Sequence, residues 1–219
     1  MEDSGLISGN ELFQKSYFKA HEKEFLELVE KGQHPKALYI GCSDSRVVPN
    51  LMVNSAPGDL FVVRNIGNFV APHKPSEDFH STASAIEYAV SVLKVKNIIV
   101  CGHTHCGAIK AIHTKSCSDN PELVHTKTWL TLGESAKSQA LLALGANADK
   151  EVLYRLTEKL SVISQLENLL TYPSVSKRVN SGDISIHGWV YDIESGEIDC
   201  YDPESSQFVP ISSLKAKDL

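Results

Sequence analysis

Three short apolar runs stand out in the first half of the chain. They cover residues 37–40, 60–63 and 98–101, and glycine follows the first and the third. Continuous apolar runs of this length are typical of strands buried on both faces of a sheet. Between the second and third runs, residues 81–93 place their apolar side chains on one helical face. Strands that alternate with helices predict an α/β fold with a mainly parallel central sheet and flanking helices.

Helices and a strand pair are predicted outside this region. Residues 149–170 form an amphipathic pattern, and residues 184–192 and 197–201 flank the turn Ser195-Gly196, which predicts a C-terminal antiparallel strand. The buried stripe of the long helix is expected to contain Val152, Leu153, Leu156, Leu160, Ile163 and Leu166. Ser8 to Glu11 has the spacing of a capping box, so we expect N-terminal helices that end near Gly32. We expect one domain over residues 1–219, with a helical arm (1–34) that packs on a partner subunit and an α/β body (35–219).

Composition narrows the functional class. The chain has 219 residues, 42% of them hydrophobic, and a formal net charge of −6. The absence of a Lys/Arg block argues against nucleic acid or an anionic membrane as the main partner. The polar, acidic start MEDSGLISGN is not typical of a secretory or transit signal, so a cytoplasmic location is expected. The five cysteines and nine histidines stand out, because clustered Cys and His in a reducing compartment indicate metal binding or catalysis.

Two segments place metal-binding side chains at the ends of predicted strands. Cys42 follows the first strand, and His103 and Cys106 follow the third. Ligands at the carboxyl ends of neighbouring parallel strands can meet at one ion. Two cysteines and one histidine without an obvious fourth protein ligand are typical of an open, catalytic zinc site. Spacing alone leaves Cys101 and His105 as alternative ligands, although Cys101 is expected to pack inside the strand.

Asp44 and Arg46 follow Cys42 closely and allow two interpretations. They form either a turn with a solvated ion pair, or a pair in which the guanidinium holds the carboxylate toward the metal or its water. Their position beside a candidate ligand favours the second interpretation. Gly102 and Gly107 have the spacing of a phosphate-binding loop, but Ala108 and Ile109 stand where Lys and Ser/Thr are required. A nucleotide-binding loop is therefore disfavoured.

At these residues the sequence resembles the β-class carbonic anhydrases, and more closely their fungal members. The similar segments are Gly32-Gln33, Cys42 to Arg46, Pro57 to Phe61, Val63 to Asn68, Ala85 to Ala89, and Cys101 to His103 with Cys106-Gly107. The resemblance implies one Zn²⁺ per chain on Cys42, His103 and Cys106. It also implies that Asp44 and Arg46 are the catalytic dyad, with Asp44 accepting a hydrogen bond from zinc-bound water, or serving as a fourth ligand in a closed state.

The resemblance further implies a substrate and an assembly. Reversible hydration of carbon dioxide to bicarbonate and a proton, by zinc-bound hydroxide, is the implied reaction. The implied lining of a narrow carbon dioxide pocket is Gln33, Phe61, Ile66 and Tyr88. The resemblance implies that this pocket crosses the interface of a homodimer and that the assembly is a homodimer or a homotetramer. Some family members have a second, inhibitory bicarbonate site formed by a tryptophan, an arginine and a tyrosine. Arg64 and Tyr191 match the arginine and the tyrosine, but Tyr39 stands in place of the tryptophan, which argues against bicarbonate inhibition at this site.

Two other functions are compatible with the same ligands. One is hydrolysis of a related heterocumulene such as carbon disulfide, and the other is a zinc-stabilised thiol-sensing module in which Cys101, Cys117 or Cys200 reacts. A purely structural zinc site needs neither Asp44 nor Arg46, which argues against the second alternative. The sequence does not identify a proton shuttle among His73, His80, His105 and His113.

Overall fold

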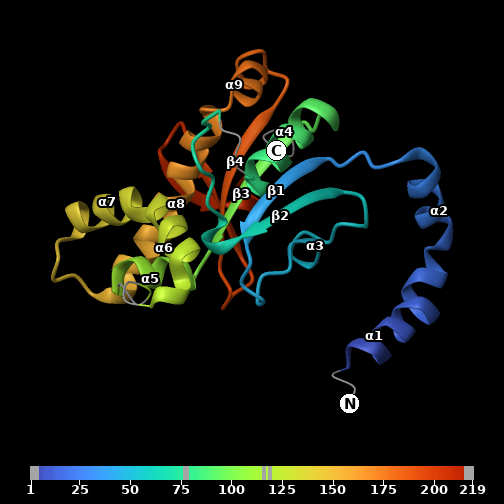
Figure 1. Ribbon diagram of the computed structural model, residues 1–219, viewed down its shortest axis with the longest axis horizontal. Coiled ribbons are helices and arrows are strands. Elements are labelled where there is room, and N and C mark those ends of the chain that lie inside the picture. The colour runs from blue at the N-terminus through green and yellow to red at the C-terminus, as the bar shows by residue number, and fades with distance from the viewer. Residues whose placement is uncertain (1–4, 76–78, 115–116, 118–119, 215–219) are drawn as a thin grey trace.

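The computed structural model describes residues 5–75, 79–114, 117 and 120–214, and a six-stranded sheet forms its centre (Figure 1). The strand order is β2-β1-β3-β4-β5-β6. The strands are β1 (Ala37–Cys42), β2 (Leu60–Asn65), β3 (Asn97–His103), β4 (Ser185–Tyr191), β5 (Ile198–Asp202) and β6 (Gln207–Pro210). The first four are parallel, whereas β5 and β6 are antiparallel. The expected α/β fold with a mainly parallel sheet is confirmed, and β6 is an additional strand that the pattern did not predict.

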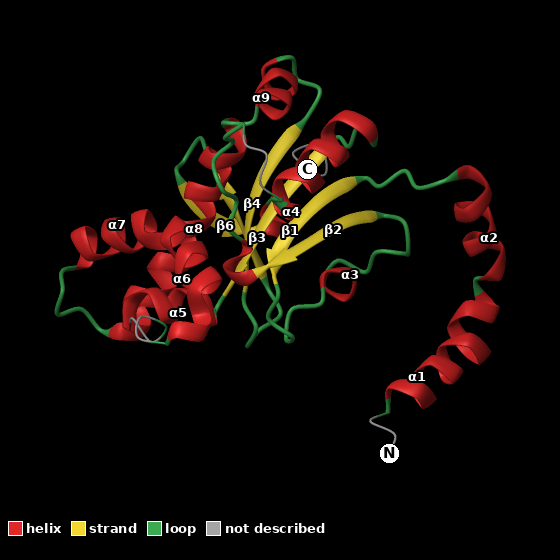
Figure 2. Cartoon of the chain, in the orientation of Figure 1, coloured by secondary structure: helices red, strands yellow, loops and turns green. Residues whose placement is uncertain are grey.

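Helices cover both faces of this sheet (Figure 2). On one face the apolar side chains pack against α4 (Ser81–Glu87), α8 (Lys150–Leu170) and α9 (Pro173–Asn180). On the other face they pack against α3 (Pro49–Met52) and the segment that follows β6. Three more helices gather beside α8: α5 (Gly107–Thr114), α6 (Val124–Leu130) and α7 (Glu134–Leu144). Of these, α6 and α7 lie in a stretch where no element was predicted.

Helix α8 is confirmed, but its buried stripe differs from the prediction. Val152 is 52% exposed, whereas the polar residues Thr157, Glu158 and Gln165 are buried. The physical reason is that these polar groups bind partners in the body: Gln165 Oε1, for example, accepts the backbone N–H of Val70 at 2.8 Å. The helix comes close to the sheet over glycines, since a Cβ at Gly188 would lie 2.8 Å from a methyl group of Val162. Hydrophobic periodicity alone cannot reveal a helix face that is buried through polar contacts.

The N-terminal arm extends away from the sheet (Figure 1). It consists of α1 (Leu6–Phe13), a π-helical turn (Gln14–Phe18) and α2 (Glu22–Lys31), and none of its described residues is buried. The predicted capping box is wrong. The N-cap residue of α1 is Gly5, which has a φ of 82°, and the helix starts at Leu6, so Ser8 lies inside the helix. The predicted end at Gly32 is confirmed. Within the described ranges, no helix has both the length and the apolar character needed to cross a membrane.

Candidate functional site

The carboxyl ends of β1 and β3 lie side by side at the place where the order of strands reverses, because β2 was added on one side of β1 and β3 on the other. β1 lies between β2 and β3, and the connections through α3 and α4 pass over opposite faces. Open α/β sheets form their sites at such a switch point. Cys42 ends β1, His103 ends β3, and Cys106 follows just before α5. Their ligand atoms all lie within 4.8 Å of one another.

These three side chains fit a zinc ion. All are buried, with Cys42 at 5%, His103 at 1% and Cys106 at 3% exposure. His103 Nδ1 lies 2.9 Å from the carbonyl oxygen of Thr104, to which it donates, and this fixes the tautomer and leaves Nε2 free to coordinate. Among the described residues this buried Nε2 has no hydrogen-bond partner. A buried imidazole nitrogen without a partner beside two cysteine sulfurs is the donor set that zinc prefers.

The two cysteines are prepared for metal binding in different ways. The pKa of Cys42 is lowered, chiefly by a hydrogen bond with Cys106, with His103 and the amides of Asp44 and Gly67 adding to the effect. The pKa of Cys106 is raised by its hydrogen bond with Cys42 and by burial, although the amides at the start of α5 oppose this rise. The lowered pKa of Cys42 favours its thiolate form, and zinc binding would require Cys106 to lose its proton as well.

Asp44 and Arg46 form a bidentate pair beside this cluster. Arg46 Nε donates to Asp44 Oδ1 at 2.9 Å and its NH2 donates to Oδ2 at 2.7 Å. Arg46 also donates to the carbonyl oxygen of His105 at 3.0 Å. Asp44 Oδ2 lies 3.9 Å from His103 Nε2. The hydrogen bonds from Arg46 hold the pKa of Asp44 well below its usual range, so the carboxylate is ionised and fixed at the edge of the cluster.

A second arginine holds the loop that carries Cys42 and Asp44. Arg64 Nε donates to the carbonyl oxygen of Cys42 at 2.9 Å, and its NH2 donates to that of Asp44 at 2.6 Å. Tyr39 is 1% exposed and packs with Tyr191 in the core on one face of the sheet. In this arrangement Arg64 supports the backbone of the cluster.

The alternative ligands lie outside the three-residue cluster. Cys101 is 1% exposed, and burial raises the pKa of its thiol to about 12, so it stays protonated. The His105 side chain contacts acidic groups instead, with Nε2 at 3.4 Å from Glu194 Oε2. In the described part of the chain, Cys42, His103 and Cys106 form the one such cluster of metal-binding side chains.

Of the four expected pocket residues, Ile66 alone lies beside the metal ligands of its own chain. Ile66 directly follows Asn65, which pairs with Cys42 across β1 and β2, so it lies beside the cluster. Phe61 pairs instead with Leu38 near the start of β1, and its ring stacks on Tyr88 with centroids 5.9 Å apart. Gln33 lies exposed between α2 and β1. Within one chain the structure therefore does not bring Gln33, Phe61 and Tyr88 together with the metal ligands.

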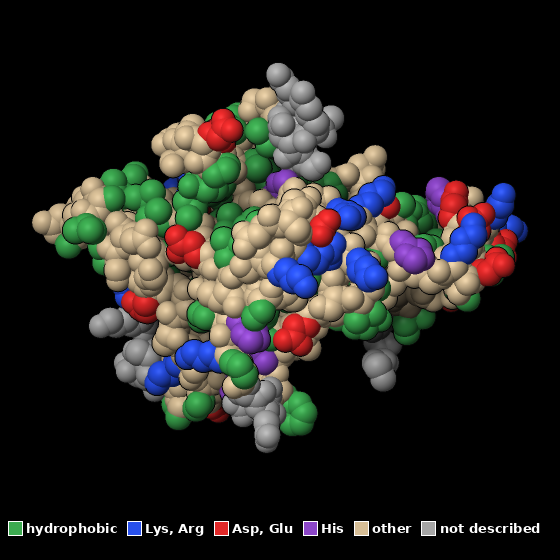
Figure 3. Space-filling model, turned by 90° about the horizontal axis from the view of Figure 1, so that it is seen from above, with side chains coloured by type: hydrophobic (Ala, Val, Ile, Leu, Met, Phe, Trp, Pro, Cys, Tyr) green, Lys and Arg blue, Asp and Glu red, His purple; other side chains and the backbone are tan. Residues whose placement is uncertain are grey.

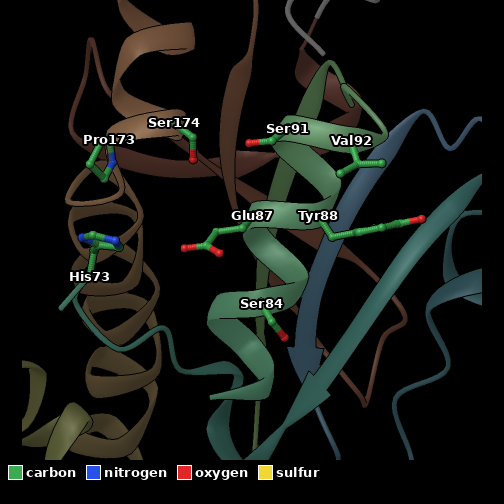
Figure 4. Close-up of a pocket in the computed structure, with 8 residues that line it drawn as sticks. All are labelled: His73, Ser84, Glu87, Tyr88, Ser91, Val92, Pro173 and Ser174. Atoms are coloured by element: carbon green, nitrogen blue, oxygen red, sulfur yellow. The ribbon is translucent and has the colours of Figure 1, made fainter. Parts of the chain in front are cut away.

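A groove of about 530 Å³ runs beside α4 and contains Tyr88 (Figure 4). The Tyr88 ring points away from Glu87 and His73 toward the strands. None of the groove's lining residues belongs to the cysteine–histidine cluster. The remaining shuttle candidates have structural contacts: His80 Nδ1 accepts the N–H of Ala83 at the start of α4, and His113 Nε2 lies 2.9 Å from Thr157 Oγ1.

One residue that the sequence analysis did not single out forms a hydrogen bond with the backbone of a proposed metal ligand. Glu158 on α8 is 3% exposed, and its Oε1 accepts the backbone N–H of Cys106 at 3.0 Å. Arg155 NH2 lies 3.1 Å from the same oxygen. The sequence pattern showed only that Glu158 lies close to the buried side of an amphipathic helix. It could not show the contact with Cys106, which is 52 residues away in the chain. Glu158 anchors the turn that carries Cys106.

We expect Glu158→Gln to remove a pH dependence of stability. Burial raises the pKa of Glu158 from 4.5 to about 7. The folded state therefore retains a proton that the unfolded state has lost, and stability falls as pH rises through this range, by at most about 3 kcal/mol. Glutamine keeps the acceptor for Cys106 but does not titrate. Urea unfolding at pH 5 to 8 should show a stability gain of the variant over wild type that grows with pH.

Glu167→Gln, at an exposed site on α8, is the control for this experiment. If the stabilities of wild type and Glu158→Gln changed in parallel with pH, the raised pKa of Glu158 would not explain the pH dependence.

Known proteins are similar to this chain over almost its whole length. The family model described as "Carbonic anhydrase" matches residues 37–198. A carbonic anhydrase of Pseudomonas aeruginosa is 41% identical over 207 residues, which are 94% of this chain and 91% of the relative. The structure of the β-carbonic anhydrase CcaA matches with a TM-score of 0.84 and 40% identity, covering 94% of this chain and 90% of that one.

The expected fungal subtype is not supported. A tetrameric β-carbonic anhydrase of the ascomycete Sordaria macrospora matches with a TM-score of 0.76 and 31% identity, covering 89% of this chain and 93% of that one. The bacterial relative from Pseudomonas is more similar in sequence, at 41% identity. The fold, the zinc-compatible cluster and these relatives agree, and the chain belongs to the β-class carbonic anhydrase family, whose members are zinc-dependent lyases.

Proposed function

We propose that the chain hydrates carbon dioxide reversibly to bicarbonate and a proton, with Cys42, His103 and Cys106 as its zinc ligands. The observation that carries this proposal is the convergence of three buried donors beside a carboxylate that is held by an arginine. Bound zinc would lower the pKa of a coordinated water toward ~7 and so supply a nucleophile at neutral pH. Two thiolates and one imidazole leave a position open for that chemistry.

Asp44 and Arg46 are proposed as the catalytic dyad. Asp44 is charged and accepts hydrogen bonds, so it can orient an oxygen nucleophile through the nucleophile's proton. Arg46 fixes the direction of the carboxylate through two parallel hydrogen bonds and is itself tied to the carbonyl of His105. To serve as a fourth ligand, Asp44 would have to give up at least part of this pairing. In this structure both of its oxygens bind Arg46.

The substrate pocket is proposed to combine residues from two chains. Phe61 and Cys42 are separated by four positions of strand register, which corresponds to about 13 Å along the strand. Phe61 with Tyr88 therefore lies too far from its own metal ligands to line their pocket. We assign Ile66 to the pocket of its own chain, and Gln33, Phe61 and Tyr88 to the pocket of the partner. The rings of Phe61 and Tyr88 would hold carbon dioxide, while Gln33 would donate a hydrogen bond to a substrate oxygen.

The N-terminal arm supports this assembly. Apolar side chains lie exposed among charged ones on the arm (Figure 3), for example Leu6 at 78%, Leu12 at 67% and Val29 at 84% exposure. Such surfaces are typical of contacts between subunits. We propose a homodimer in which the arm packs on the partner, and a further assembly into a tetramer, as the Sordaria relative is described. The division of the chain into an arm and a body at residue 34 stays a prediction. The cytoplasmic location also stays a prediction.

Mixing two inactive variants tests the function and the shared pocket together. Cys42→Ser removes a zinc ligand, and Tyr88→Asp places a charge in the apolar pocket. We expect each variant alone to lack stopped-flow carbon dioxide hydration, and co-refolded mixtures to regain about a quarter of wild-type activity. Half of random dimers are heterodimers, and each heterodimer has one intact site.

A chain carrying both substitutions is the control, because it cannot be complemented by either single variant at an intact site. Native mass spectrometry would establish that heterodimers form. Heterodimers without activity, from variants whose wild-type parent is active, would contradict the shared pocket. An inactive, zinc-loaded wild type would contradict the proposed function itself.

A further inference from the structure

Trp129 makes a single directed hydrogen bond to the turn beside the metal cluster. It lies on α6, in the stretch to which neither the sequence pattern nor the resemblance assigned a role. Its indole Nε1 donates to the carbonyl oxygen of Ile66 at 2.7 Å. The indole also packs against the apolar group that includes Cys42, Cys106 and Leu130. A half-buried tryptophan thus reaches the backbone of the Ile66–Asn68 turn from a helix distant in sequence.

The same peptide group contacts a proposed zinc ligand on its other side. The N–H of Gly67 donates to Cys42 Sγ at 3.4 Å. The carbonyl of Ile66 and the N–H of Gly67 belong to one planar peptide unit, so the position of one determines the direction of the other. A hydrogen bond accepted by the carbonyl also polarises the N–H and strengthens the bond that it donates. The indole and the cysteine sulfur are therefore connected through one rigid group.

The rest of the turn is fixed independently of Trp129. Asn65 Oδ1 accepts the N–H of Phe69 at 2.9 Å, and Asn65 Nδ2 donates to the carbonyl of Phe69 at 2.9 Å. Gly67 has a φ of 76°, and a Cβ there would lie 2.9 Å from the Cβ of Ala108. Glycine is thus required by both conformation and space. Removing only the indole N–H should leave the turn folded and change the orientation and polarity of one peptide.

We propose that Trp129 is a positioning residue for the zinc ligand Cys42, acting through the Ile66–Gly67 peptide. This inference rests on the proposed function, because it assumes that Cys42 binds the metal. A hydrogen bond to a ligand thiolate withdraws charge from the sulfur and restricts its direction. Loss of the indole donor weakens that bond, so the sulfur donates more charge to the metal. The same peptide carries Ile66, so Trp129 also fixes a residue of the proposed substrate pocket.

The test replaces Trp129 with phenylalanine and examines the cobalt-substituted and zinc-loaded proteins. In the cobalt protein we expect the sulfur-to-metal charge-transfer band to move to longer wavelength, because a sulfur that has lost a hydrogen bond gives up an electron more easily. In the zinc protein we expect deuterium exchange of a peptide spanning residues 61–69 to become about fivefold faster at Gly67. Trp189→Phe, at a buried position of β4, is the matched control and should change neither signal.

A second variant guards against a folding defect. Replacing Trp129 with 3-benzothienylalanine keeps the shape of the indole and substitutes sulfur for the N–H group, so it should reproduce the effects of Trp129→Phe. An unmoved cobalt band and unchanged exchange in either folded variant would overturn the inference. A wild-type protein that shows no thiolate-to-cobalt band would instead overturn the proposed ligand role of Cys42.

Discussion

Cys106→Ser is expected to lose zinc and, with it, carbon dioxide hydration. Cys106 is 3% exposed, and its ligand atom lies within 4.8 Å of those of Cys42 and His103. Serine is nearly isosteric, but its hydroxyl does not ionise near neutral pH and is a poor zinc ligand. Structural zinc sites bind with about 10–16 kcal/mol, so one of three protein ligands accounts for about 3–5 kcal/mol, or on the order of a 10²- to 10⁴-fold change in affinity. Zinc measured by mass spectrometry after dialysis should fall far below one ion per chain.

Cys200→Ser is the matched control for this substitution. Cys200 is also 3% exposed and lies on β5, in the core on the other side of the sheet from α8. It should keep both zinc and activity, because burial raises the pKa of its thiol and it does not belong to the cluster. Cys106→Ser protein that retained stoichiometric zinc and wild-type rates would show that the cluster is not the catalytic metal site.

Asp44→Asn is expected to retain zinc but to lose most of its activity. Asparagine has the size of aspartate but no charge, and its amide group repels one of the two donors of Arg46. If Asp44 orients the nucleophile, kcat/KM for hydration should fall on the order of 10²- to 10³-fold. Zinc content should stay at the wild-type level, since the three ligands are unchanged. The combination of retained metal and lost activity separates a catalytic role from a structural one.

The direction of the Asp44 pKa shift determines the pH range of this experiment. Arg46 lowers the pKa of the folded-state carboxyl below its ordinary value of 3.8. The stabilisation from this pair is therefore fully present above that ordinary value and is lost only as pH falls through the lowered pKa. Asp44 should be ionised from pH 6 to 9, so its titration does not shape the wild-type rate profile there. Asp202→Asn, which removes the same charge from the last residue of β5, is the control. Equal activities of the two variants would remove Asp44 from the mechanism.

Local sequence patterns were sufficient where the stabilising contacts are local. The apolar runs at 37–40, 60–63 and 98–101 became β1, β2 and β3 because a buried parallel strand must be apolar on both faces. The pattern failed to predict the buried face of α8. Glu158 and Gln165 lie on that face because they form hydrogen bonds with backbone groups that are distant in sequence. It also failed at Ser8, because Gly5 provides an earlier helix start.

The sequence by itself determined the parallel sheet, the end of the arm at Gly32 and the local spacing of His103 and Cys106. Only the tertiary structure decided that Cys42 meets them, because the strand order places β1 directly beside β3. It also decided that Glu158 holds the turn of Cys106 and that Trp129 holds the peptide beside Cys42, across 52 and 63 positions of the chain. Hydrophobic periodicity records which side of an element is buried, whereas a hydrogen bond between distant segments depends on how the elements pack.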